Sequence, residues 1–193
     1  LTARHLLDCM AVFDSNKNAF SLLQMISHTL EMRPLLRIKS KEQDDIQEEL
    51  TKRYDLLLKE EPGIHSIDYD DFINSIKTAL FFDSWIDEKD EDFLFEKYSI
   101  CPGEIRVKQD NADWLLYAAE ELAALQDHKL AVKEIRKLRL RIQHGAKEEL
   151  LPLLKLQGIG RIRSRKLYLH GVNDLGDIKK IDQTSLSQLI GKA

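Results

Sequence analysis

A glycine pair followed by cations is the part of the sequence best suited to chemistry. Residues 150–171 contain two short apolar stretches around Gly158-Ile159-Gly160, and cations follow the second glycine. Glycine lets a backbone approach a phosphate closely, and the N–H groups that open a following helix act as anion donors. Such contacts hold a phosphate backbone without reading base sequence. The residues predicted to make them are Gly158, Ile159, Gly160, Arg161, Arg163, Arg165 and Lys166.

The same stretch, closed by Gly171, resembles the helix-hairpin-helix motif. In that motif Ile159 would be the apolar plug that sets the turn into the core. Gly-x-Gly alone is weakly specific, and a helix turn with a basic surface is the alternative interpretation. Residues 189–193 look like the start of a further hairpin that is cut off at the end of the chain.

Trp114 is a second candidate for contact with a ligand. The pattern predicts a helix from Pro102 to about Leu125, with one apolar stripe at Ile105, Ala112, Leu115, Leu116, Ala119, Leu122 and Ala123. Trp114 lies roughly 140° from the centre of that stripe, at about 100° per residue. A large aromatic residue in such a place either packs on a second element or is exposed for a ligand.

The elements that position these residues are predicted to be helices throughout, so the fold class is all-α. Apolar residues recur at spacings of three and four, and no convincing period-two stretch occurs. The predicted helices are 3–13, 19–31, a long charged helix from Ser40 to Pro62, 69–86, 91–98, 102–125, 127–144, two in 150–171, and short ones near 174–180 and 184–190. Phe81, Phe82 and Trp85 are predicted to lie in the core.

The net charge of −4 on 193 residues conceals a division along the chain. Residues 1–100 carry 12 Lys and Arg against 21 Asp and Glu, whereas residues 129–166 carry 12 against 3. Such asymmetry is typical of a nucleic-acid-binding face, although a solvated basic helix is the alternative. The basic helix 127–144 is accordingly either a solvated face or a rail for a phosphate backbone.

Several function classes are excluded or disfavoured. No apolar run approaches the ~18 residues of a membrane span, and the start of the chain lacks the apolar region of a signal peptide. The two cysteines suit a reducing cytoplasm, and the histidines show no metal-ligand spacing, so no metal site is predicted. Acidic runs occur mostly at helix starts, where capping explains them. No phosphate-binding Gly-x-x-x-x-Gly-Lys-Ser/Thr loop is present, so the chain alone is predicted to be non-catalytic.

Several strings in one order carry a more specific resemblance. They are residues 148–153, 158–168, 76–80, 85–88, 102–106 and 112–115. Together they resemble the C-terminal part of the archaeal Hjm-type superfamily-two DNA repair helicases, over roughly residues 65–193. The absence of an initial Met also suggests a piece of a longer protein.

This resemblance implies a helical-bundle ratchet domain at 1–147 and a helix-hairpin-helix domain at 148–193. It also implies that Trp114 stacks on a base of the unwound strand, and that Arg161, Arg163 and Arg165 bind the emerging strand and restrain the motor. The family usually has two adjacent basic residues about two turns before the tryptophan, where this chain has Arg106-Val107, and the seven-residue spacing falls on Val107. Either Arg106, Lys108 or neither residue takes the basic role, and Asn111 is a further candidate for DNA contact on the ratchet helix.

The function implied is the DNA-binding part of an ATP-dependent 3′-5′ DNA helicase in repair or recombination at stalled forks or junctions. ATP and Mg²⁺ would bind motor domains that precede this segment, so no cofactor is expected here. The expected partners are single-stranded or forked DNA and those motor domains, in a monomeric, cytoplasmic and nucleoid-associated archaeal protein without membrane contact. The alternatives are a protein-interaction cassette of a related RNA helicase and a free-standing helix-hairpin-helix repair module.

Overall fold

The computed structural model describes residues 2–191, apart from the side chains of Gln183 and Ile190. Over this range its secondary structure is helical, which confirms the all-α prediction. In chain order they are α1 (Thr2–Ala11), α2 (Ala19–Ser27), α3 (Gln43–Lys52), α4 (Tyr69–Ile86), α5 (Glu91–Tyr98), α6 (Pro102–Leu125), α7 (Lys129–His144), α8 (Leu151–Leu154), α9 (Arg161–Leu169), α10 (Leu175–Ile178) and α11 (Gln183–Ile190). Short 3-10 helices lie at Leu30–Met32, Ser40–Glu42, Tyr54–Leu56 and Glu148–Leu150. Within this range no helix is both long and apolar enough to cross a membrane.

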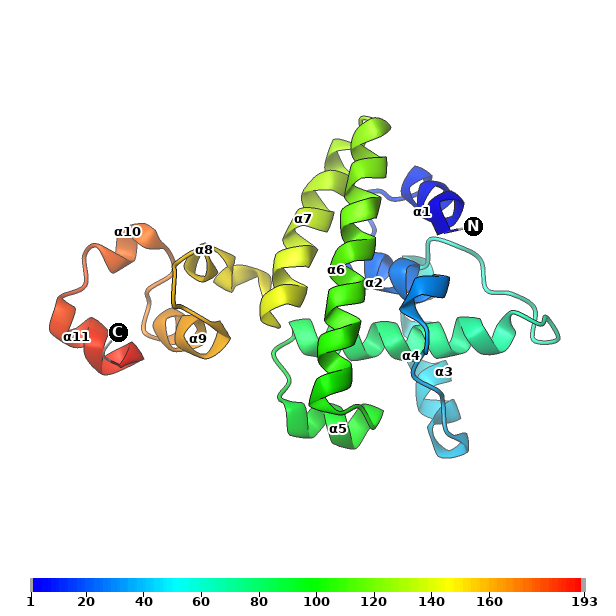
Figure 1. Cartoon of the computed structure of the whole chain (residues 1–193), viewed down its shortest axis with the longest axis horizontal. Helices are drawn as coiled ribbons and strands as arrows, with labels where there is room; N and C mark the ends of the chain where they lie inside the picture. The colour runs from blue at the N-terminus through cyan, green and yellow to red at the C-terminus, as the bar shows by residue number, and fades with distance from the viewer. Residues whose placement is uncertain (1, 192–193) are drawn as a thin grey trace.

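Helices α6 and α7 form an antiparallel pair at the centre of the molecule (Figure 1). The predicted stripe of α6 faces inward: six of its seven members are buried, and Leu122 is partly buried and packed on the same core. Ala112, Ala119 and Ala123 are fully buried, so small side chains let neighbouring helices approach α6 closely. The N-terminal helices α1 and α2 also contact α6.

Helix α4 crosses the central pair and packs on α2 and α7 (Figure 1). Phe81 and Phe82 are fully buried, as predicted, but Trp85 is only partly buried at the edge of this core. Lys77 is also buried, and its ammonium binds the Glu42 carboxylate at 2.7 Å and the Arg37 carbonyl at 2.9 Å. This pair ties the irregular segment before α3 to α4.

The prediction of one long helix from Ser40 to Pro62 is wrong. Helix α3 ends at Lys52, and Arg53 leaves the α-helical backbone conformation. In a longer helix the carbonyl oxygens of Asp55 and Leu57 would accept from backbone N–H groups one turn later. In this structure they accept from the Lys17 ammonium. A contact from a distant part of the chain therefore competes with the helix at this point, which periodicity alone does not show.

Helices α8 to α11 have small apolar cores of their own. One contains Leu150, Leu151 and Leu154 together with Ala146 from the segment just before them, and the other contains Leu153, Leu167 and Val172. We call residues 148–191 the hairpin unit and residues 2–147 the bundle; the domain boundary between 147 and 148 stays a prediction. The further hairpin predicted at 189–193 extends into residues 192 and 193, which lie outside the described residues.

Gly145 ends α7 and turns the chain towards the hairpin unit. Its φ of 61° lies in the left-handed region, which disfavours side chains with a Cβ. A Cβ built there would lie 2.6 Å from the Trp85 ring. The Trp85 Nε1–H donates to the Ile142 carbonyl at 2.7 Å, which holds the indole in place against Gly145.

We expect Gly145→Ala to lower the free energy of unfolding by roughly 2–4 kcal/mol, because the left-handed backbone and the steric clash each cost on the order of 1–2 kcal/mol. Gly171→Ala is the matched control, since Gly171 has a φ of 79° but open space where a Cβ would lie. It should show only the backbone cost, as measured by urea unfolding. Equal losses in the two variants would contradict the role of Trp85.

Candidate nucleic-acid interface

Trp114 stands on the outer face of α6. Its side chain is 58% exposed, while its neighbours Leu115 and Leu116 are fully buried. Val107, seven residues earlier, is 59% exposed and lies on the same face, because seven residues make about two turns. Trp114 is therefore not a core residue, and a flat aromatic surface of α6 is open to a ligand.

The three polar candidates on α6 differ in where their side chains lie. Arg106 is exposed, and Asn111 is half-buried with its amide donating to the Glu31 carbonyl at 3.3 Å. Lys108 is 6% exposed, and its ammonium donates to the Pro34 carbonyl at 2.6 Å and more weakly to the Met32 carbonyl at 3.5 Å. Burial lowers the pKa of the Lys108 ammonium.

The prediction that Lys108 contacts DNA is therefore corrected. Lys108 follows Ile105 by three residues and precedes Ala112 by four, so it lies on the buried face of the helix. This spacing is visible in the sequence and is the signal that excludes Lys108 from the candidates. Arg106, which points to solvent, remains the candidate that stands near the place of the missing basic residue.

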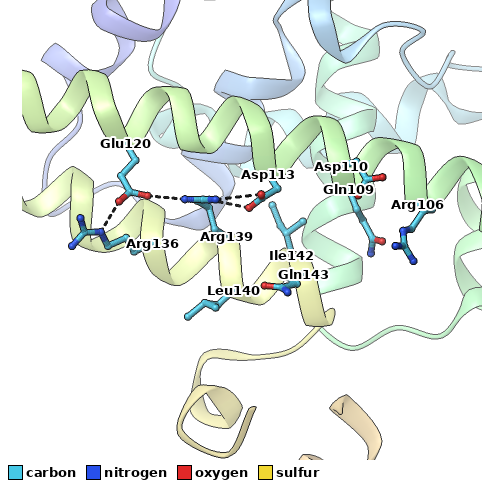
Figure 2. Close-up of a pocket in the computed structure, with 10 residues that line it drawn as sticks. All are labelled: Arg106, Gln109, Asp110, Asp113, Glu120, Arg136, Arg139, Leu140, Ile142 and Gln143. Carbon is cyan, nitrogen blue, oxygen red and sulfur yellow. Dashed lines mark hydrogen bonds and ion pairs between the residues drawn. The ribbon is translucent and has the colours of Figure 1, made fainter. Parts of the chain in front are cut away.

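A polar groove of about 700 Å³ is lined by residues of α6 and α7, beside the place where the two helices pack together (Figure 2). Figure 2 shows Arg139 reaching between two carboxylates of α6: it binds Asp113 at 2.9 and 3.2 Å and Glu120 at 3.0 Å. Arg136 binds Glu120 at 2.6 Å. Arg106 and Gln109 point from α6 into the same groove. The charges of the groove are thus largely balanced between the two helices.

Much of the basic cover of α7 serves such internal contacts. Lys137 binds Glu134 and Glu148 at 2.8 and 2.9 Å, and Arg141 donates to the carbonyl oxygens of Ala146 and Ile86. Burial lowers the pKa of Arg141. Neither a solvated face nor a simple phosphate rail describes these residues, because their cations face protein groups.

The hairpin places two glycines at an open backbone. Gly158 has a φ of 77°, and Gly160 precedes α9 in extended conformation. No atom lies within 4 Å of a Cβ built at either glycine, so a ligand has access to both. Ile159 is half-buried against the core formed by Leu153, Leu167 and Val172.

The cations of α9 divide into two groups by direction. Arg163 and Lys166 are exposed, and the Arg163 guanidinium donates to the Gly158 carbonyl at 2.8 Å. Arg161 and Arg165 instead face the bundle. The Arg161 guanidinium lies 4.9 Å from the Trp85 ring centre, and Arg165 binds Glu88 at 2.8 and 2.5 Å and Glu149 at 2.9 Å.

Glu88 is the residue at this site that sequence reasoning missed. Its place in an acidic run suggests capping at a helix start, but the Asp90 side chain fills that role by accepting from the Phe93 N–H. Burial raises the pKa of the Glu88 carboxyl, but hydrogen bonds from Arg165 and from the Lys147 N–H outweigh it, so the pKa lies below its ordinary value. Its only sequence signal is its place beside Trp85, in the string Trp85-Ile86-Asp87-Glu88.

The described residues hold no group of three or more His, Cys, Asp or Glu side chains arranged to bind a metal ion. What the arrangement offers chemically is non-covalent binding: an exposed indole, an open glycine hairpin and exposed cations. These are the parts of a surface that binds a phosphate backbone and stacks on bases.

Comparisons with known proteins agree in pointing to helicases. The family model for archaeal helicase, domain 4, matches residues 20–145. The chain is 33% identical over 192 residues to the ATP-dependent DNA helicase Hel308 of Methanocaldococcus jannaschii, covering 100% of this chain and 15% of that protein. It is 33% identical to Hel308 of Thermococcus kodakarensis, covering 99% and 17%, and 32% identical to Hel308 of Pyrococcus abyssi, covering 99% and 26%. The chain thus spans about a quarter or less of the length of these relatives.

We expect Lys108→Met to lower the free energy of unfolding by about 1–3 kcal/mol, because the buried carbonyl oxygens of Pro34 and Met32 lose their donor. Affinity for DNA should not change, as measured by fluorescence anisotropy beside urea unfolding. Arg106→Met is the control on the exposed side, with a stability change within about 0.5 kcal/mol. A loss of DNA affinity in Lys108→Met at unchanged stability would restore Lys108 as a ligand.

Proposed function

Because the chain belongs to the archaeal helicase domain 4 family, we propose that it is the DNA-binding part of an ATP-dependent 3′-5′ DNA helicase. The proposed parent protein acts in repair or recombination at stalled forks or junctions. Its motor domains, in the same polypeptide, bind ATP and Mg²⁺, and this part contacts the unwound strand as a monomer. The observation that carries the proposal is the exposed indole of Trp114 on the long helix α6.

Stacking on Trp114 suits a helicase that must move along any sequence. A base stacked on an aromatic ring contributes about 1–3 kcal/mol, and every base offers a face for stacking. The indole is free to take a base on its exposed side, while the neighbouring residues anchor α6 in the core. The stacked base is thereby held at a fixed place on a rigid helix, which a moving strand can engage and leave.

The hairpin unit contributes the second contact in this proposal. The backbone at Gly158 and Gly160 is open, and the N–H groups at the start of α9 favour a phosphate. Arg163 and Lys166 add exposed cations beside it. A base is thus bound at α6 and the backbone at the hairpin, neither with sequence preference.

We expect Trp114→Ala to weaken binding of single-stranded oligothymidylate by roughly 5- to 150-fold, which corresponds to the ~1–3 kcal/mol of one stacked base. The melting temperature should stay within a few degrees of the unchanged chain, because the indole is largely outside the core. The measurement is anisotropy titration at several salt concentrations.

Two further variants control this experiment. Trp114→Phe should retain most of the affinity, and Leu125→Ala, which removes an 84% exposed apolar side chain at the far end of α6, should change little. A chain that binds no single-stranded DNA, with or without Trp114, would contradict the proposal. That result would favour a protein-interaction cassette, whereas hairpin-dependent binding without Trp114 would favour a repair module.

We expect the double variant Arg163→Gln, Lys166→Gln to reduce the slope of log affinity against log salt by about 0.7 for each phosphate that the two cations no longer neutralise. Lys129→Gln with Lys133→Gln removes the same charge from the opposite end of α7 and is the matched control. A slope that falls equally in both double variants would show that net charge, and not the hairpin, sets the affinity.

A further inference from the structure

Helix α9 of the hairpin unit contacts the bundle through a small set of residues that we call the seam: Trp85, Glu88, Gly145, Arg161 and Arg165. Two of these lie at the end of α4, one ends α7, and two come from α9. The seam lies where the hairpin unit meets the lower end of α7 (Figure 1). Residues 77 apart in sequence are joined there by charge-assisted hydrogen bonds.

Glu88 is the centre of the seam. Its carboxylate accepts from Nε and Nη2 of Arg165 at 2.8 and 2.5 Å, and from the Lys147 backbone N–H at 3.0 Å. One side chain therefore binds both Lys147, the last residue before the hairpin unit, and helix α9. The Glu88 side chain is 14% exposed and that of Arg165 is 25% exposed, so the pair is partly shielded from solvent.

The backbone of Glu88 is unusual for such a residue. Its φ of 70° lies in the left-handed region, where glycine or asparagine would be favoured. Strained conformations of this kind persist where the surroundings require them, and they are concentrated at functional places. Here the strained turn directs the carboxylate from the end of α4 to Arg165.

Arg161 makes the second set of contacts between α9 and the bundle. Its guanidinium lies over the Trp85 ring and donates to the Gly145 carbonyl at 3.2 Å and to the Lys89 carbonyl at 3.4 Å. Arg161 and Arg165 are four residues apart and thus share one face of α9. Exposed Ile162, Arg163 and Lys166 lie away from the seam, so α9 has a docking face and a free face.

We propose that Glu88 is a positioning residue, which acts through Arg165 to fix the hairpin unit relative to α6 so that one DNA strand is held at two places. In this assignment Arg161 and Arg165 dock the hairpin unit and do not bind phosphate. The DNA part of the inference rests on the proposed function, whereas the docking part stands on the contacts of the seam alone.

Fixed geometry matters because two weak contacts act together only if one strand can reach both. Joining two binding surfaces raises affinity through effective concentration, and the gain disappears when the geometry prevents simultaneous contact. Disrupting the contacts of the seam should therefore lower the affinity for a long oligonucleotide that spans both surfaces. It should leave a short oligonucleotide, which contacts one surface, almost unchanged.

The decisive experiment is a charge exchange in the full chain. The probes are labelled oligothymidylates of about 8 and about 30 nucleotides, since one compact binding surface covers roughly 4–16 nucleotides. We expect Glu88→Arg and Arg165→Glu, each alone, to lower the affinity for the long probe on the order of tenfold and the affinity for the short probe less than twofold. The double variant should regain most of the affinity for the long probe, although it lacks the arginine at 165.

The opposite result would overturn the assignment. If Arg165 binds phosphate, the double variant binds the long probe as weakly as Arg165→Glu alone does. In that case Glu88→Gln strengthens binding of the short probe, because Arg165 is released from Glu88 and becomes available to phosphate. The salt slope separates the two roles as well. Removing a cation that neutralises a phosphate lowers the slope by about 0.7, whereas removing a cation that only docks the hairpin unit does not.

A distance measurement keeps the inference testable if the double variant fails to fold or if Glu149, the second partner of Arg165, repels the new glutamate. Spin labels on exposed Cys101 and on Lys180→Cys report the distance between bundle and hairpin unit; Cys9 is buried, and burial raises its pKa to about 12, which protects it from labelling. Glu88→Gly removes the carboxylate and relieves the backbone strain.

We expect the distribution of distances between the two spin labels to broaden in Glu88→Gly, while helical content and melting temperature are retained. A distribution as narrow as in the unchanged chain would overturn the positioning role, whatever the DNA results. If the unchanged chain binds neither probe, the proposed function fails, and the distance measurement still decides whether Glu88 docks the hairpin unit.

Discussion

The packing of one face of α6 is the constraint on which the rest of the structure depends. Its stripe is buried against neighbouring helices, and three of the stripe residues are fully buried alanines. A helix that buries one face so fully has its other side fixed in direction as well. Trp114 is exposed for this reason, and the core behind α6 fixes the place from which its side chain projects. The binding surface and the core are thus two sides of the same helix.

Position on this helix decides what each cation does. Arg106 and Lys108 are two residues apart, which is roughly 200° of rotation, so one points to solvent and the other to the core. A buried ammonium is stable only with partners, and Lys108 finds them in carbonyl oxygens of the segment before α3. A count of basic residues near Trp114 therefore overstates the charge available to a phosphate. Rotation along the helix is the better guide.

Local periodicity predicted the helices well, because each depends on the spacing of residues within itself. The predicted helix 102–125 has the bounds of α6, and the predicted stripe is its buried face. The failures involve contacts between distant residues. Lys17 takes carbonyl oxygens that a longer α3 would have used, and Glu88 meets Arg165 across 77 positions. The spacing of residues within one helix carries no information about pairs between distant helices. Sequence reasoning therefore identified single candidate residues for the site, but not which of them contact one another.

The uneven charge along the chain has two physical uses. An acidic first half and a basic second half attract each other. At Glu88 with Arg165 that attraction joins the bundle to the hairpin unit, and at Asp87 with Lys147 it holds the end of the bundle that leads into the hairpin unit. Cations bound in this way are not available to phosphates, and those that remain exposed, such as Arg163 and Lys166, lie on the free face of α9. Because bidentate arginine pairs fix direction as well as proximity, the seam orients that free face. Charge asymmetry in a sequence therefore indicates domain docking as readily as it indicates nucleic acid, and only the positions of the partners separate the two.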